Sequence, residues 1–142
     1  MRAILAAMAI LASMVAGQAR AGAGTTDYLG RWRTQSEGGV VEIYRCGPAL
    51  CGRIVMSGRL LKDPDARDRK NKSAALRGRR MLGLDLLSGL EPDGAGWKGR
   101  LYNPEDGETY SGTMRLTGPG KLKVQGCVLY ILCRSQTWTR VA

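Results

Sequence analysis

Residues 96–126 read GWKGRLYNPEDGETYSGTMRLTGPGKLKVQG, and this stretch decides the fold. Apolar residues alternate with polar ones through it: Tyr110 and Met114 share one strand face, and Leu122 and Val124 share another. Such alternation is typical of strands that place one face on a core. Two turn clusters, NPEDG at 103–107 and GPG at 118–120, interrupt it and predict chain reversals. The stretch therefore predicts three consecutive antiparallel strands.

The same period of two extends outward in both directions. Eight short strands are predicted, at residues 29–34, 40–46, 51–57, 81–87, 96–103, 109–117, 121–126 and 134–141. Short strands joined mostly by hairpins favour an all-β, antiparallel up-and-down barrel, because closure removes exposed strand edges. A β-sandwich of two sheets is the alternative.

One segment departs from the strand pattern. From Arg59 to Arg80 the chain carries nine Lys or Arg and three Asp, a net charge of +6, and we call it the basic segment. It is predicted to be a long exposed loop, with a turn or two of helix over residues 70–78. The polar group Asp63, Asp65, Asp68 and Asn71 is interpreted as Asp–Arg pairing on a solvated loop, because calcium loops need a glycine turn and a closing Glu.

The N-terminus predicts export. Arg2 precedes an apolar run at residues 3–16, and Ala19-Arg20-Ala21 matches an A-x-A cleavage pattern. The run is shorter than the ~20 residues that cross a bilayer. We expect a signal peptide at 1–21, cleavage near Ala21, and a single domain at 22–142 in the periplasm or outside the cell. Removal of two arginines lowers the net charge from +10 to +8, which suits anionic lipid or envelope polymers rather than nucleic acid.

The cysteines predict two disulfides. An even count in an oxidising compartment favours bridges over a zinc site. Cys46 and Cys51 flank one predicted hairpin, and Cys127 and Cys133 flank another. Loop entropy alone would favour longer bridges. A hairpin brings its own ends together, so we predict the local pairs 46–51 and 127–133.

Missing residue types narrow the chemistry. The chain has no histidine, which excludes Ser-His-Asp and Cys-His nucleophile systems and histidine metal sites. The acidic group Glu105, Asp106 and Glu108 surrounds Gly107 and is interpreted as turn chemistry. No catalytic residue, cofactor or metal is predicted, so the sequence favours a binding or interaction protein over an enzyme.

One tryptophan and one arginine suggest how the barrel closes. Gly30-Arg31-Trp32 lies in the first predicted strand and Arg140 in the last, and these strands are neighbours in a closed barrel. Arg140 is therefore predicted to stack on Trp32 as a structural plug. This Gly-x-Trp plus terminal Arg arrangement resembles the lipocalin signature.

A wider resemblance covers residues 29–141. It rests on Gly30-x-Trp32, the stretch CGPALCGRIV at 46–55, Asp68-x-x-Asn71 with Arg80 and Gly83-Leu84, WKG at 97–99, YNPEDGxTY at 102–110, and Gly126-Cys127 with QTWxR at 136–140. With these pieces in order, the chain resembles the exported bacterial family called domain of unknown function 2147 (DUF2147). The resemblance implies a lipocalin-like or calycin-like barrel and, by analogy of fold, a small apolar or amphipathic ligand.

Two functions follow from these expectations. A barrel of this size has room for packed side chains or for one small ligand, and Gly99 and Gly112 are expected to leave room on the inward face. The candidate ligand-binding walls are Val55, Trp97, Leu101, Tyr110 and Met114, and the candidate basic rim is Arg77, Arg79 and Arg80. Alternatively, the basic segment docks on anionic lipid or on a partner in the envelope.

Overall fold

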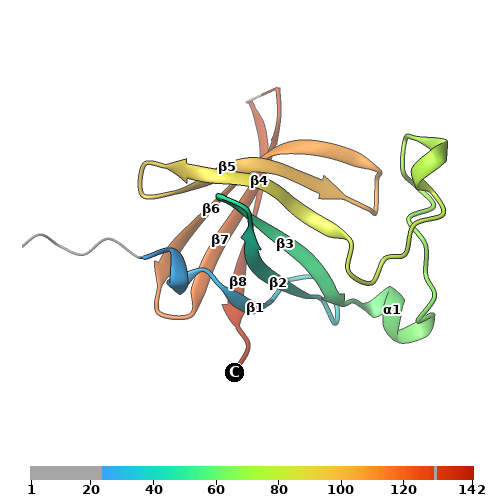
Figure 1. The fold of residues 1–142 in the computed structure, drawn as a ribbon, viewed down its shortest axis with the longest axis horizontal. Coiled ribbons are helices and arrows are strands. Elements are labelled where there is room, and N and C mark those ends of the chain that lie inside the picture. Colours follow the sequence, from blue (N-terminus) through green and yellow to red (C-terminus); the bar gives the residue numbers. More distant parts are fainter. Residues whose placement is uncertain (1–23, 130) are drawn as a thin grey trace, which may run out of the picture.

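The computed structural model describes residues 24–129 and 131–142. Its eight strands form one closed barrel in chain order, each antiparallel to the next, and β8 pairs with β1 (Figure 1). The elements are η1 Thr25–Asp27, β1 Gly30–Arg33, β2 Val40–Cys46, β3 Ala49–Met56, α1 Gly58–Lys62, η2 Ala74–Leu76, β4 Asp85–Asp93, β5 Gly96–Asn103, β6 Glu108–Gly118, β7 Lys121–Val128 and β8 Leu132–Arg140. The predicted up-and-down barrel is confirmed and the sandwich is excluded. The predicted signal peptide lies outside the described residues.

Up-and-down connectivity gives the barrel two distinct ends. The β2–β3, β4–β5 and β6–β7 turns lie at one end, which we call the closed end. The β1–β2, β5–β6 and β7–β8 connections and α1 lie at the other, which we call the open end. The buried core comprises Tyr28, Trp32, Val41, Ile43, Leu50, Leu87, Leu90, Trp97, Met114, Leu122, Val124 and Trp138.

The shortest strand completes the barrel at the closed end. β1 pairs with β8 only through Trp32 with Arg140 and Arg33 with Thr139. The Arg140 guanidinium lies 4.3 Å from the centre of the Trp32 ring and donates hydrogen bonds to the carbonyls of Asp27 and Leu29. Stacking and hydrogen bonds thus reinforce a seam that has little strand pairing.

The fourth strand begins later than predicted. The sequence indicated residues 81–87, whereas β4 runs from Asp85 to Asp93. Met81 and Leu84 are buried because they join a second apolar cluster with Ile54, Leu60 and Ala66 at the start of β4. The apolar residues in this region are spaced for packing against the basic segment. Strand periodicity does not describe such packing, so it placed the strand too early.

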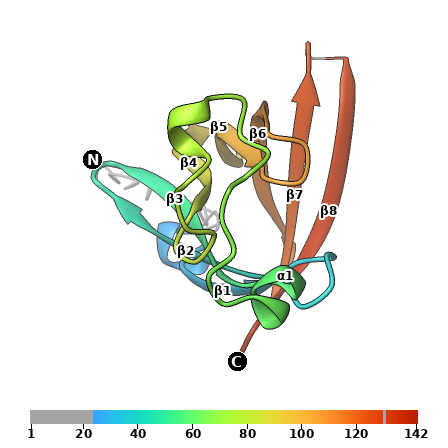
Figure 2. The ribbon, with the colours of Figure 1, turned by 90° about the vertical axis from the view of Figure 1, so that its right-hand side faces the viewer.

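The basic segment is more ordered than a solvated loop. Its first turn is α1, where Ser57 caps the helix by accepting a hydrogen bond from the Leu60 amide at 3.2 Å. The helix predicted at residues 70–78 is only the single 3₁₀ turn η2. The description as an exposed loop is wrong for Asp68 and Asn71, which are 0% and 7% exposed. Figure 2 shows the segment crossing the open end.

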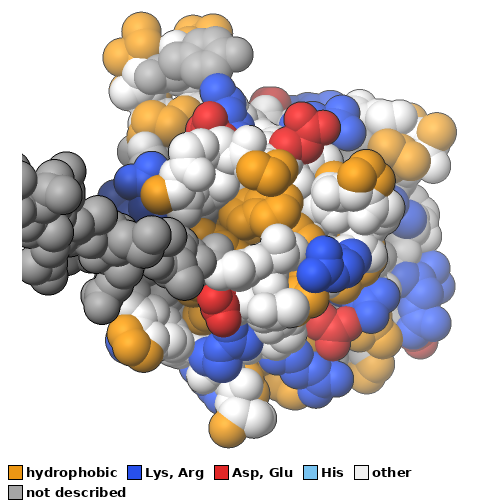
Figure 3. Space-filling model, turned by 60° about the vertical axis from the view of Figure 1, so that its left-hand side comes forward, with side chains coloured by type: hydrophobic (Ala, Val, Ile, Leu, Met, Phe, Trp, Pro, Cys, Tyr) orange, Lys and Arg blue, Asp and Glu red, His pale blue; other side chains and the backbone are white. Residues whose placement is uncertain are grey.

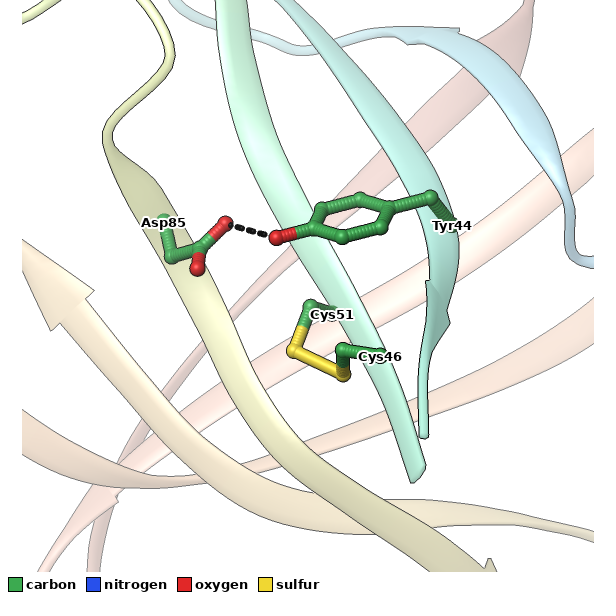
Figure 4. The surroundings of a disulfide bond; sticks show 4 residues. All are labelled: Tyr44, Cys46, Cys51 and Asp85. Atoms are coloured by element: carbon green, nitrogen blue, oxygen red, sulfur yellow. Dashed lines mark hydrogen bonds between the residues drawn. A yellow bond between two sulfur atoms is a disulfide. The ribbon is translucent and has the colours of Figure 1, made fainter. Parts of the chain in front are cut away.

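Both predicted disulfides are present. Cys46 and Cys51 join the β2–β3 hairpin, and Cys127 and Cys133 join the β7–β8 hairpin. Beside the first bridge, the Tyr44 hydroxyl donates a 2.8 Å hydrogen bond to Asp85 (Figure 4). Two disulfides are typical of an oxidising, extracytoplasmic location. Among the described residues, no helix has the length and apolarity needed to cross a membrane.

Candidate functional site

A cavity of about 1080 Å³ opens at the open end of the barrel. Its mouth is formed by the β1–β2 loop, α1, the β5–β6 turn and the β7–β8 hairpin. Its apolar interior includes Val41, Ile54, Met81, Leu86, Leu101, Tyr102, Tyr110, Val124 and Trp138. The barrel is therefore filled at the closed end and hollow at the open end.

The residues predicted to line a ligand site divide between these two halves. Leu101 and Tyr110 are paired across β5 and β6 and line the cavity. Trp97 and Met114 are paired four residues further along and belong to the packed core, outside the cavity lining. Val55 is absent from the lining, although its neighbours on both sides contribute to it. Alternation along β3 explains this, because adjacent side chains point to opposite faces.

The glycines that make room are not those expected. A Cβ at Gly99 would approach the Ser88 carbonyl oxygen to 2.6 Å, and one at Gly112 would approach the Leu101 Cβ to 2.9 Å. These two glycines permit close packing of neighbouring strands. Gly126 on β7 is the glycine in the cavity wall, where a Cβ would make ordinary contacts of 3.4–3.7 Å with Tyr110 and Leu101.

Charged side chains surround the mouth. Arg59 on α1 lies 3.7 Å from Glu105 of the β5–β6 turn, and Lys62 and Arg134 also line the cavity. Tyr110 donates a short hydrogen bond to Asp106. That bond raises the pKa of Tyr110. At Asp106, burial acts to raise the pKa, but hydrogen bonds led by the one from Tyr110 hold it below its usual range.

The three arginines expected at the rim lie elsewhere. Arg77 donates to the Asn71 carbonyl at 2.8 Å, and Arg80 pairs with Asp65 at 3.1 Å. Arg79 pairs with Asp68 at 2.9 Å. None of the three lines the cavity. The cations at the mouth are instead Arg59, Lys62 and Arg134, which come from α1 and β8.

The interior of the basic segment holds a polar cluster that sequence reasoning placed on a wet surface. Asp68 accepts hydrogen bonds from the Tyr102 hydroxyl at 2.6 Å, from Asn71 Nδ2 at 2.9 Å and from Arg79 Nε at 2.9 Å. Burial, followed by the bond to Asp68, raises the pKa of Tyr102. Since Tyr102 lies on β5 and lines the cavity, the cluster fastens the segment to the barrel at the mouth.

The β5–β6 turn supports the same attachment. Gly107 has a φ of +73°, and a Cβ there would lie 1.9 Å from the Lys70 carbonyl oxygen. Lys70 donates to the Glu105 carbonyl at 2.9 Å, and Lys72 pairs with Glu108 at 3.1 Å. Glycine is required at position 107 by both backbone conformation and close approach. The acidic turn therefore receives the basic segment in addition to reversing the chain.

A closed eight-stranded antiparallel barrel with a cavity at one end is a lipocalin-like barrel. Residues 30–140 match the family described as "Uncharacterized protein conserved in bacteria (DUF2147)", and the chain belongs to this family. A solved structure from Helicobacter pylori, described as a protein of the lipocalin family, superposes with a TM-score of 0.72 at 23% identity. The match covers 81% of this chain and 83% of that one, and it supports the fold. Comparison with curated proteins found no match.

Proposed function

We propose that this protein binds one small amphipathic molecule, with its apolar body in the cavity and its polar head at the mouth. The cavity carries the proposal, because its volume of about 1080 Å³ is slightly above the ~300–1,000 Å³ usual for ligand pockets and is large enough for a small molecule. Leu86, Leu101 and Val124 would contact the body. Burial of an apolar body against such walls is favourable at roughly 25 cal/mol per Å².

The mouth supports a ligand that also carries a polar group. Lys62 and Arg134 line the cavity, and neither forms an ion pair with an acidic residue in the described part of the chain. Tyr110 and Gln136 also line the cavity: the Tyr110 hydroxyl donates to Asp106 and can still accept a hydrogen bond, and the Gln136 oxygen accepts from Trp138, which leaves its side-chain nitrogen able to donate. A wholly apolar ligand would use neither these two cations nor this remaining hydrogen-bonding capacity, whereas an amphipathic one would use both.

We place this function in the cell envelope, in keeping with the two disulfides and the N-terminal sequence pattern. Docking of the basic segment on anionic lipid or an envelope polymer is the alternative function. It is the weaker one, because Arg77, Arg79 and Arg80 each bind another group of the segment.

The test compares a blocked cavity with an intact one. Gly126→Phe directs a ring into the cavity between Leu101 and Tyr110. Gly78→Phe is the matched control, since nothing lies within 4 Å of a Cβ at Gly78 and this residue does not line the cavity. The probes are a dansyl-labelled fatty acid in titrations, and native mass spectrometry of protein recovered from its host.

Blocking the cavity should weaken probe binding at least tenfold, which corresponds to about 1.4 kcal/mol, while the control binds like the wild type. Native mass spectra should show a lipid-sized adduct on the wild type and on Gly78→Phe only. Equal binding by all three proteins, or no uptake by any of them, would refute the proposal.

A further inference from the structure

The β7–β8 hairpin extends past the barrel and ends in exposed aliphatic side chains. Cys127 is the last β7 residue that pairs with β6, and beyond it Val128 pairs only with Leu132. Figure 1 shows this hairpin projecting from the barrel, and Figure 3 shows hydrophobic side chains gathered on the projection. The exposed fractions are 41% for Val128, 79% for Leu129, 82% for Ile131 and 72% for Leu132. We call these four residues the aliphatic tip.

The chain's other disulfide-bonded hairpin shows that a turn closed by a disulfide does not require exposed aliphatic side chains. Between Cys46 and Cys51, glycine occupies the left-handed position, with φ +70° at Gly47, and Leu50 is 1% exposed. In the aliphatic tip, Leu129 itself has a φ of +50°. A leucine there is unfavourable for the backbone, where glycine or asparagine is preferred, and its side chain is exposed to water. A residue that is unfavourable both for the backbone and for solvation points to a role outside folding.

We propose that the aliphatic tip inserts into the surface of an anionic lipid bilayer. Arg134 lies two residues after Leu132 on β8, and Arg59 and Lys62 lie at the same open end. Arg59 is paired with Glu105, so Lys62 and Arg134 are the cations lining this end that form no ion pair in the described part of the chain. Aliphatic side chains beside basic ones are the combination that binds anionic membrane surfaces.

The size and shape of the tip favour lipid over a protein partner. The four exposed residues are far fewer than the ~20–30 residues that a stable protein interface uses on each side. A narrow projection suits insertion among lipid headgroups, where no complementary pocket is needed.

Backbone chemistry limits the depth of insertion. The outer edges of the projecting hairpin have no partner strand among the described residues, and unpaired backbone groups are costly in hydrocarbon. The tip would therefore reach the headgroup and upper acyl region, about 5–10 Å deep. Val128, Leu132 and Arg134 also line the cavity, so docking would turn its mouth toward the lipid. The inference does not require the cavity to bind a ligand.

The experiment measures co-sedimentation of the purified protein with vesicles of phosphatidylcholine, with and without phosphatidylglycerol. Leu129→Ser with Ile131→Ser removes apolar surface from the tip, and Leu76→Ser with Leu82→Ser is the control, since those leucines are 43% and 50% exposed in or beside the basic segment. Every variant has the same N-terminus, so its contribution cancels in the comparison. Intact disulfides are checked by mass spectrometry.

The tip variant should lose at least tenfold in vesicle affinity, and the control should bind like the wild type. Arg134→Gln, which removes one positive charge, should weaken binding about fivefold, only when phosphatidylglycerol is present. Leu129→Gly should weaken binding without lowering the unfolding temperature, because glycine suits the positive φ. If Leu129 had only a structural role, vesicle affinity and unfolding temperature would change together.

Three results would overturn the inference: vesicle binding that the tip variant retains, vesicle binding that only the control loses, or absence of binding by the wild type. A wild type that dimerises in light scattering, with a monomeric tip variant and no vesicle binding, would assign the tip to a second copy of the chain. Gly126→Phe should bind vesicles like the wild type, which separates this inference from the proposed ligand site.

Discussion

Replacement of Asp68 by alanine should release the basic segment from the barrel without unfolding the barrel. The Asp68 carboxylate is fully buried and accepts hydrogen bonds from Tyr102, Asn71 and Arg79. The barrel core contains no residue of the segment. Loss of the carboxylate would therefore act on the attachment of the segment rather than on the core.

The magnitude follows from the partners that lose their acceptor. Hydrogen bonds to a charged group contribute about 1.5–3 kcal/mol each, and Tyr102 and Asn71 donate two of them. The Arg79 side chain is 37% exposed, so solvent screening reduces its share. We expect a local loss of about 3 kcal/mol, at the lower end of the ~3–5 kcal/mol typical of a broken buried pair. At about 1.4 kcal/mol per factor of ten, opening of the segment becomes about a hundredfold more frequent.

Limited trypsin digestion measures this opening, because the segment contains nine Lys or Arg and cleavage tracks the open population when reclosing is fast. Asp68→Ala should be cut within residues 59–80 about a hundredfold faster, with an unchanged circular-dichroism spectrum of the barrel. Asp65→Ala is the matched control, since it breaks an exposed pair with Arg80 and should change cleavage only a few-fold. Equal rates for the two variants would refute this account of the attachment.

Two further predictions concern titration and barrel closure. Burial and the bond to Asp68 raise the pKa of Tyr102 above its usual 10.0. The stabilising contribution of Tyr102 is therefore complete below pH 10 and is lost as the pH rises through the higher pKa of the folded state. Tyrosinate absorbance should show delayed ionisation in the native protein, and titration of all five tyrosines together near pH 10 would contradict this. Arg140→Met should lower the free energy of unfolding in urea by about 1–2 kcal/mol through loss of the Trp32 contact and two hydrogen bonds, whereas no change beyond that of Arg31→Met would show that the seam does not depend on it.

Strand alternation and hairpin geometry were sufficient to predict the barrel. β2 and β5 have the predicted bounds, and both disulfides join the predicted pairs. The start of β4 was not predictable in this way, because Met81 and Leu84 are apolar for packing under the basic segment. Periodicity reports that a side chain is buried, but it does not report which surface covers it.

The candidate site was predictable only in part, for a related reason. Leu101 and Trp97 lie on the same face of the same strand, yet one lines the cavity and the other packs in the core. Their distance along the barrel axis makes the difference, and alternation carries no information on that distance. Asp68 likewise appeared solvated because its partners Tyr102 and Arg79 are 34 and 11 residues away in sequence.

The asymmetry of the barrel connects the fold to the proposed functions. At the closed end, Trp32 and Trp97 fill the interior with rings, and this end supplies much of the apolar burial that a domain of this size needs. The open end can therefore keep a cavity and an exposed aliphatic hairpin without loss of the fold. On this reasoning Gly126→Phe, which fills the cavity, should leave the free energy of unfolding unchanged or raise it, because it adds buried apolar surface where a void exists. Marked destabilisation by this variant would show that the open half is already packed, and the space for a ligand would then be lost.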